Sequence, residues 1–240
     1  MDKNSKDASN ESYNTDVSAE QRRANMNRLI ATASHDLRQP FQAMQLFHHL
    51  LMGRMPDASS RELCEKMGEA SQACEAMIRA LLDVLALEAG LVTPAPRAFP
   101  VDDVLERLLR EFDPKADAKG LRLKVHPAGV DVRSDPELLE KLLRPLLANA
   151  VRFTQKGGVL LGARRRGNRL RIEVWDTGTG LAEPDLTAIT EELATGRSDR
   201  RRGFGIAIAQ RTAALLGHPL AVRSRAGKGS GFFVTVPMAG

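Results

Sequence analysis

The sequence predicts an α+β fold in which a helical hairpin, forming a dimeric four-helix bundle, is followed by an α/β sandwich. Two observations predict the hairpin: apolar residues recur at three-four spacing in two successive stretches, and a turn with glycine and proline separates them. Beyond a proline-rich linker, short alternating strands mixed with helices predict the sandwich. We expect a polar, disordered tail or linker over residues 1–20, the hairpin over 21–92 and the sandwich over 97–240.

The first long helix is expected from about Ala19 to Gly53. Its apolar residues alternate between positions a and d of a heptad repeat, which places His35 at position f, away from the seam. A histidine there faces water, and neutral imidazole is a nucleophile at cellular pH. His49 also falls at f and His48 at e, so position alone does not single out His35. The residues at a and d are Met26, Ile30, Ala33, Leu37, Pro40, Met44, Phe47 and Leu51.

A second helix is expected from a cap at Ser59 or Ser60 to about Gly90, after a turn over residues 53–57. The same heptad rhythm continues on it, so the two helices are expected to pair as a hairpin. The seam residues of this second helix are Leu63, Met67, Ala70, Cys74, Met77, Leu81 and Val84. Further apolar residues widen each stripe beyond what one partner helix covers, and self-association into a four-helix bundle would bury them. We therefore expect a homodimer. The widening residues are Leu29, Phe41, Leu50, Ile78 and Leu82.

The sequence Thr-Pro-Ala-Pro over residues 93–96 continues neither a helix nor a strand ladder, and the domain boundary is placed there. Beyond it, helices are expected over residues 101–112, 136–153 and 204–216. The second of these begins with Ser134-Asp135-Pro136, a capping sequence with proline at the first helical position. Strands are expected over residues 121–125, 158–163, 169–175, 220–225 and 231–236. This order predicts a mixed sheet with helices on one face.

Composition limits the classes of function. The 240 residues are 42% hydrophobic and 4% aromatic, so the core should be aliphatic and few rings are available to stack on bases. A nucleic-acid partner is disfavoured, although arginines cluster over residues 164–166 and 197–202. No apolar run could span a bilayer and no signal sequence opens the chain, so we expect a cytoplasmic location without membrane insertion. Cys64 and Cys74 are expected to be reduced core residues.

Three short motifs occur in order within residues 97–240. Asn149 lies in the helix over 136–153. Asp176 follows the strand over 169–175 and precedes Gly178 and Gly180. Gly203-Phe204-Gly205 opens the last helix after an arginine-rich loop. Each motif is common when it occurs alone, so only their combination is informative.

Together with residues 34–40 around His35, these motifs resemble those of the sensor histidine kinases of two-component signalling, over about residues 22–237. In this resemblance residues 34–40 are the phosphoacceptor box and the hairpin is the dimerisation and histidine-phosphotransfer domain. Asn149 matches the N box, Asp176 opens the first glycine box, and residues 203–205 match the second. Residues 227–232 resemble the closing glycine motif, where threonine is commoner than Ser230.

The resemblance implies ATP and Mg²⁺ as cofactors. Asp176 is then the acceptor for the adenine amino group, the glycines admit the nucleotide to the backbone, and the Asn149 amide oxygen is the metal ligand. A helix start at Gly203 and Gly205 would offer free N–H groups to the phosphates. The implied cofactor-binding residues are Asn149, Arg152, Phe153, Asp176, Gly178, Gly180, Arg202, Gly203, Phe204, Gly205 and Ser230.

The implied reaction is in-line attack of His35 on the γ-phosphate of ATP, with Asp36 orienting the ring or taking its proton. The phosphoryl group then passes to an aspartate on the receiver domain of a response regulator. Gln39 stands where threonine or asparagine often supports dephosphorylation of that partner, and its amide can hold a water. The signal would come through the N-terminal tail, from a sensor domain preceding this chain, or from a sensor partner.

Two positions depart from the family pattern. Pro145 stands four residues before Asn149, where a further asparagine is usual, and an interior proline costs a helix about 3 kcal/mol. Arg201 replaces the first glycine of the second glycine box. These departures leave open a degenerate phosphotransfer or interaction module that binds ATP poorly. An ATPase of the same superfamily, like gyrase, is a further alternative, but the activating carboxylate of such enzymes is replaced here by Pro145.

Overall fold

A computed structural model describes residues 39–53, 57–195 and 204–239, together with five single positions between Met26 and Leu37. The chain divides into two compact units, Met1–Val92 and Thr93–Gly240. Within the described part of the chain, no helix combines the length and the apolar character that crossing a membrane requires.

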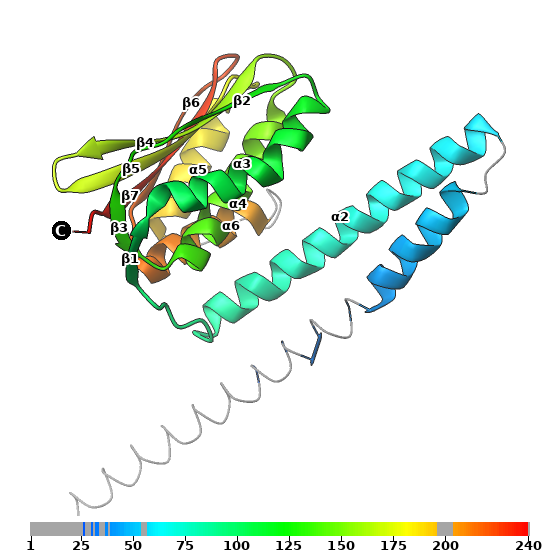
Figure 1. Cartoon of the computed structure of the whole chain (residues 1–240), viewed down its shortest axis with the longest axis horizontal. Coiled ribbons are helices and arrows are strands. Elements are labelled where there is room, and N and C mark those ends of the chain that lie inside the picture. The colour runs from blue at the N-terminus through cyan, green and yellow to red at the C-terminus, as the bar shows by residue number, and fades with distance from the viewer. Residues whose placement is uncertain are drawn as a thin grey trace, which may run out of the picture. The chain divides into compact units, whose positions relative to one another are not determined.

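The first unit contains a helical stretch over residues 39–52 and the helix α2, Ala58–Glu88, which run side by side (Figure 1). Asp57 caps α2 from an extended backbone conformation, and its carboxylate accepts the backbone N–H of Ser60 at 2.7 Å. The expected cap at Ser59 or Ser60 is therefore wrong, because Asp57 already satisfies the first free N–H groups. The helix ends at Glu88, two residues before Gly90.

Contacts within this hairpin avoid most of the predicted heptad seam, and among its described residues only Val84 is buried. Phe41 and Cys64 are buried, and the ring of His48 lies over Gly68, where an added Cβ would be 2.4 Å from Nε2. Gln45 donates to Glu75 across the pair at 2.7 Å. The seam residues Met44, Phe47, Leu51, Leu63, Met67, Met77 and Leu81 are instead exposed, and so is Cys74, which corrects its expected place in the core. A single hairpin thus leaves the heptad stripe uncovered.

The second unit is built on a five-stranded mixed sheet in the order β2-β4-β5-β7-β6. Strand β2 pairs with β4 in parallel, and the other neighbours are antiparallel. A separate antiparallel pair, β1 with β3, lies beside it. The strands are β1 Arg97–Pro100, β2 Arg122–His126, β3 Asp131–Ser134, β4 Gly158–Arg166, β5 Arg169–Asp176, β6 Leu220–Arg225 and β7 Gly229–Pro237.

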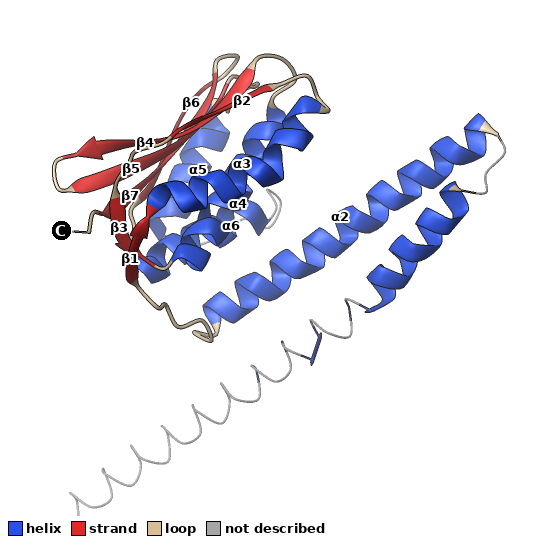
Figure 2. Ribbon diagram, in the orientation of Figure 1, coloured by secondary structure: helices blue, strands red, loops and turns tan. Residues whose placement is uncertain are grey.

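Helices lie on one side of this sheet (Figure 2). They are α3 Val101–Asp117, α4 Pro136–Phe153, α5 Glu183–Thr195 and α6 Phe204–Leu216. Alternate strand residues such as Leu170, Ile172 and Val174 point toward them and form one aliphatic core with the leucines of α3 and α4. The predicted sandwich, with helices on one face of a mixed sheet, is confirmed.

Three elements are absent from the sequence-based expectation. Strands β1 and β3 contain four residues each, too few for alternation to be recognised. Helix α5 contributes only Ile189 and Glu192 to the buried set, so its apolar periodicity is weak. This helix nevertheless forms part of the wall of the cavity described next.

Candidate functional site

A cavity of about 190 Å³ opens on the helical side of the sheet. It lies where the end of α4, the loop after β5, helices α5 and α6, and the start of β7 meet. Five predicted site residues border it, although they are up to 81 positions apart in the sequence: Asn149, Phe153, Asp176, Gly180 and Ser230. The remaining lining residues are Ala150, Thr179, Leu181, Ile189, Ile206 and Phe232. The site is therefore an apolar slot with polar groups at its rim.

Among the described residues that line this slot, Asp176 is the only carboxylate. It ends β5, and its Oδ1 accepts the backbone N–H of Gly178 at 2.8 Å, so the following turn holds the side chain in place. Burial raises the pKa of Asp176 above its ordinary 3.8, although the backbone amides of Gly178 and Ser230 act in the opposite direction. A carboxylate partly removed from water and held by its own turn is an acceptor prepared for a ligand donor.

At two positions of the predicted first glycine box, any side chain larger than that of glycine would clash with neighbouring atoms. Gly180 has a φ of 65°, and a Cβ there would lie 2.1 Å from the carbonyl oxygen of Arg225. A Cβ at Gly178 would lie 2.6 Å from the carbonyl oxygen of Phe153. The loop after β5 therefore packs backbone against backbone, which brings it against the end of α4 and against β6.

Asn149 lies on α4 beside the beginning of α6. A Cβ at Gly205 would be 3.7 Å from Asn149 Nδ2 and 3.4 Å from Pro145 Cβ, so the two helices are in close contact at this level. Helix α4 continues through Pro145 to Phe153. The proline thus leaves Asn149 on the same helix as the rest of the predicted N box.

Ser230 is anchored by a small hydroxyl network. Its Oγ lies 2.9 Å from Ser224 Oγ, which in turn accepts the backbone N–H of Leu181 at 2.8 Å. These bonds connect β6, β7 and the loop after β5. Sequence reasoning missed Ser224 and the apolar lining, because aliphatic residues of a slot have the same pattern as residues of the core.

The remaining predicted residues are distributed as follows. Arg152 is exposed and stacks on the half-exposed ring of Phe153 at 5.3 Å. Phe204 begins α6 and is half-buried, and Gln39 lies exposed in the helical stretch of the first unit. His35, Asp36, Arg202 and Gly203 lie outside the described residues, and so do the other arginines of the cluster over residues 197–202.

The slot has the dimensions and donors of a site for a flat ring. It is smaller than the roughly 300–1,000 Å³ of pockets that enclose a whole drug-sized ligand, so it suits a base better than a complete nucleotide. No cluster of three His, Cys, Asp or Glu residues capable of holding a metal occurs in the described ranges. A single amide oxygen at Asn149 fits a Mg²⁺ ion that takes its other ligands from phosphates and water.

Comparison with family models places two known domains on the chain. Residues 25–90 match the His Kinase A (phospho-acceptor) domain, and residues 134–240 match the histidine kinase-, DNA gyrase B- and HSP90-like ATPase domain. Asn149, Asp176, Gly180 and Ser230 all fall within the second match, and His35 falls within the first. The ATPase match supports ATP as the nucleotide of this second unit.

Comparison with individual proteins gives the same result as the family models. The chain is 28% identical over 230 residues to the sensor histidine kinase RcsC of Escherichia coli (strain K12), covering 92% of this chain and 24% of RcsC. It is 30% identical over 216 residues to the alginate biosynthesis sensor protein KinB of Pseudomonas aeruginosa, covering 87% of this chain and 36% of KinB.

Among solved structures, full-length ShkA in complex with AMPPNP superposes with a TM-score of 0.67 at 26% identity, covering 88% of this chain and 46% of ShkA. The chain thus spans less than half the length of each of these three proteins. With a phosphoacceptor hairpin followed by a histidine-kinase-type ATPase domain, the chain belongs to the sensor histidine kinases of two-component systems.

Proposed function

We propose that this chain is the catalytic core of an ATP-dependent protein-histidine kinase that phosphorylates its own His35. The observation that supports it most strongly is that residues of three predicted motifs, distant in sequence, border one slot in the ATPase unit. A phosphoacceptor hairpin precedes that unit on the same chain. The two reactants of a histidine kinase, a nucleotide and an imidazole, thus each have a place.

In this proposal the adenine ring occupies the slot between Ile189, Ile206 and Phe232. The Asp176 carboxylate accepts a hydrogen bond from the adenine amino group, and ionised Asp176 is the form required. Apolar walls exclude water from that bond and strengthen it. A Mg²⁺ ion bound with the nucleotide, with Asn149 as its protein ligand, would neutralise phosphate charge during transfer.

The transfer step moves one phosphoryl group. A ring nitrogen of His35 attacks the γ-phosphorus, the bond from that phosphorus to the bridging oxygen breaks, and ADP leaves. The other ring nitrogen then gives up its proton to Asp36, its neighbour in sequence, or to water, which leaves a neutral phosphorylated ring. The resulting phosphoramidate is then passed to an aspartate of a response-regulator receiver domain. The same proposal places the core in the cytoplasm, where ATP is available.

A homodimer is part of the proposal. The uncovered stripe of Phe47, Leu63, Met67 and Met77 is more than half exposed at every one of these positions. A second copy of the hairpin would cover it and complete a four-helix bundle. The phosphoacceptor helices of both copies would then belong to one bundle.

Nucleotide binding separates this proposal from the degenerate module. A fluorescent ATP analogue with Mg²⁺ should bind the full chain with submillimolar affinity. Asn149→Asp and Asp176→Asn should each weaken binding at least tenfold, because the first adds a negative charge beside the triphosphate and the second replaces the charged acceptor of the adenine amino group by a neutral amide. His35→Gln, the matched control outside the slot, should bind normally. Absence of saturable binding by wild type, or equal loss in the control, would overturn the proposal.

A further inference from the structure

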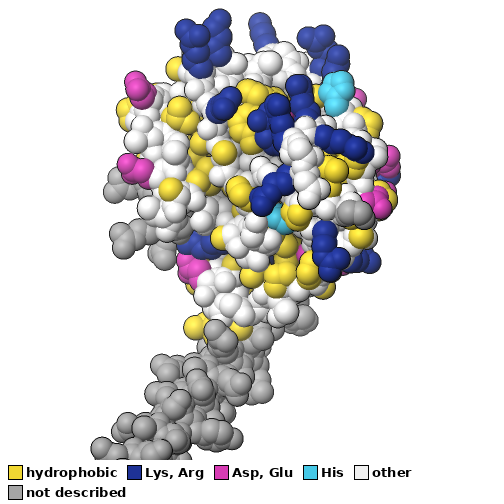
Figure 3. Space-filling view, turned by 90° about the vertical axis from the view of Figure 1, so that its left-hand side faces the viewer, with side chains coloured by type: hydrophobic (Ala, Val, Ile, Leu, Met, Phe, Trp, Pro, Cys, Tyr) yellow, Lys and Arg dark blue, Asp and Glu magenta, His cyan; other side chains and the backbone are white. Residues whose placement is uncertain are grey.

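The opposite face of the sheet is strongly basic. Within its five strands, the only carboxylates are Glu173 and Asp176, whereas lysine and arginine occur on four of them. The side chains that alternate away from the helices include those of Arg122, Lys124, Arg164, Arg166, Arg169, Arg171, Arg223 and Arg225. Figure 3 shows lysines and arginines gathered on one face, with acidic side chains near its edges.

An indole lies at the centre of this face. Three adjacent atoms of the six-membered ring of Trp175, Cε3, Cζ3 and Cδ2, would lie 2.6–2.8 Å from a Cβ built on Gly231. Such nearly equal distances occur only when the glycine lies under the flat of the ring. The indole therefore rests on bare backbone, with Phe233 edge-on at 5.1 Å and an interplanar angle of 81°.

Buried polar contacts hold this indole in place. Its Nε1–H donates to Glu173 Oε2 at 2.8 Å, and Glu173, only 3% exposed, also accepts from Arg171 at 2.6 Å. Burial raises the pKa of Glu173, but hydrogen bonds from Trp175 and Arg171 and nearby arginine charges leave it below the ordinary value. The carboxylate thus stays ionised and fixes a ring that is itself 36% exposed.

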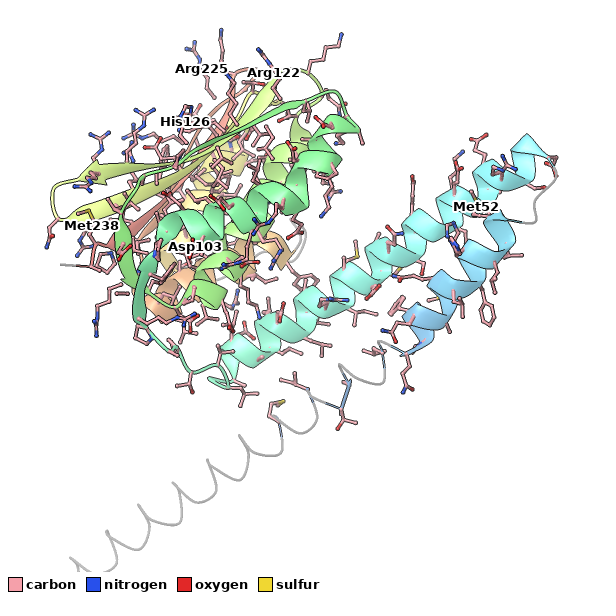
Figure 4. The ribbon with its side chains drawn as sticks, in the orientation of Figure 1. Met52, Asp103, Arg122, His126, Arg225 and Met238 are labelled. Atoms are coloured by element: carbon pink, nitrogen blue, oxygen red, sulfur yellow. The ribbon has the colours of Figure 1, made fainter. Side chains whose placement is uncertain are left out.

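A lysine and an arginine lie on opposite sides of the Trp175 ring, close enough to reach the phosphates of a nucleotide stacked on it. The strand register places Lys124, Leu160, Trp175, Gly231 and Arg223 in one row across the sheet. Neighbouring strands are about 4.8 Å apart, so Lys124 and Arg223 each lie about 10 Å from Trp175, on opposite sides. Figure 4 shows Arg122, His126 and Arg225 on the side of the sheet away from the helix that carries Asp103.

The surface is hollowed beside the ring. A depression of about 500 Å³ is lined by Trp175, Leu160, Arg122, Lys124, His126 and Lys228, among others. Its volume lies within the range that encloses a small ligand. Asp176 borders it at the end of β5, but the slot lined by Ile206 and Phe232 opens on the helical side. The depression is thus separate from the ATP slot.

We infer that this depression is a second nucleotide site, in which a base stacks on Trp175 while Arg122, Lys124 and Lys228 bind the phosphates. The occupant is a free nucleotide rather than a nucleic-acid strand, because the face presents one stacking ring within one bounded hollow. A strand takes successive aromatic platforms along its path. An indole already held in place also reduces the ordering cost of binding.

Trp175 is the only tryptophan of the chain, so its fluorescence reports this site alone. GMP added to the full chain should quench it saturably, whereas guanosine or inorganic phosphate should quench much more weakly. The double variant Arg122→Ala and Lys124→Ala should lower GMP affinity at least tenfold. Arg110→Ala, which removes one positive charge from the exposed side of α3, should leave it unchanged.

Two further comparisons show whether GMP binds in the depression or in the ATP slot. Asn149→Asp should abolish binding of the ATP analogue yet leave GMP quenching intact, and the double variant should do the reverse. No saturable quenching by GMP, quenching lost together with ATP binding in Asn149→Asp, or an equal loss in Arg110→Ala would each overturn the inference. It would also be wrong if an oligothymidylate bound and GMP did not, because the occupant would then be a strand.

Discussion

At the scale of single residues, Asp176 has an unusual position for a carboxylate. Its environment raises its pKa above 3.8, chiefly by burial, and none of the described lining residues carries a positive charge. Ligand binding that requires the ionised form must lower the pKa again, by linkage. A carbon-13 carboxyl titration by NMR should therefore place Asp176 above 3.8 in the free protein and lower with the ATP analogue bound. Titration unchanged by the nucleotide would contradict its role as the acceptor.

Gly180 and Gly227 form a matched pair that separates the cost of a steric clash from the cost of an unfavourable backbone conformation. Both have positive φ, 65° and 72°, but a Cβ at Gly180 meets the backbone of Arg225, while nothing lies within 4 Å at Gly227. Gly227→Ala should cost about 1 kcal/mol from conformation alone. Gly180→Ala should cost clearly more, about 3 kcal/mol or above, because backbone must move. Urea unfolding measures both, and equal costs would show that the loop is less tightly packed.

His218 is buried and should make stability depend on pH. Its Nε2 lies 2.7 Å from Ser134 Oγ, and its Nδ1 has no hydrogen-bond partner among the described residues. Burial, together with the charge of Arg169, lowers its pKa below 6.5, although the backbone of Gly217 acts in the opposite direction.

Because the unfolded chain then binds the proton more readily, His218 contributes full stability above pH 6.5 and loses it as pH falls below that value. The loss should be at most about 1.4 kcal/mol per pH unit. Urea unfolding of the ATPase unit in the full chain should show it, and His218→Gln should remove that part of the slope. An unchanged slope in the variant would exclude His218 as the cause.

At the scale of elements, the heptad stripe and the hairpin contact occupy different faces of α2. At 3.6 residues per turn, Leu63, Met67 and Met77 share one face, while buried Cys64 and Gly68 lie about a quarter of a turn or more away. The sequence correctly identified an apolar stripe, but periodicity cannot say which partner covers it. Phe41, placed beside the seam from the sequence, is instead the residue buried in the hairpin.

Because the apolar stripe and the hairpin contact lie on different faces of α2, a substitution in the stripe should disrupt the dimer without unfolding the hairpin. Leu63→Glu should weaken dimerisation at least a hundredfold, because about 1.5–3 kcal/mol of burial is lost in each of two copies. Ala76→Glu introduces the same charge on the exposed opposite side of α2 and should leave the dimer intact. Light scattering after gel filtration measures the mass. A monomeric wild type, or equal effects of both variants, would contradict a dimer through this stripe.

Most helices and strands of the ATPase unit were predictable because helix caps, the alternation of apolar residues and glycines at the ends of elements all indicate the same boundaries. Asp135, for example, accepts the N–H groups of Glu137 and Leu138 at 3.0 Å, as the cap before Pro136 predicts. The site was predictable only as a set of motifs, since the contacts that join them are tertiary. Neither the Ser224–Ser230 network nor the walls from α5 leave a signal in local sequence.

At the scale of the whole molecule, phosphorylation of His35 requires two units with separate tasks. The linker over residues 93–96 separates a hairpin with little buried core from a unit with a continuous one. The basic sheet face lies on the unit that carries the nucleotide slot, so a ligand there would act on the same fold that binds ATP. Phosphoryl transfer, in contrast, needs a residue from the other unit.

The most direct measurement is therefore the acid and alkali stability of label transferred from γ-labelled ATP to the full chain. Phosphohistidine is acid-labile and alkali-stable, so wild type should carry label that acid removes and alkali does not. His35→Gln should carry none, whereas His49→Gln, which changes an exposed histidine of the helical stretch over residues 39–52, should be labelled like wild type. Label that persists in His35→Gln would contradict the central claim, and so would acid-stable label in wild type.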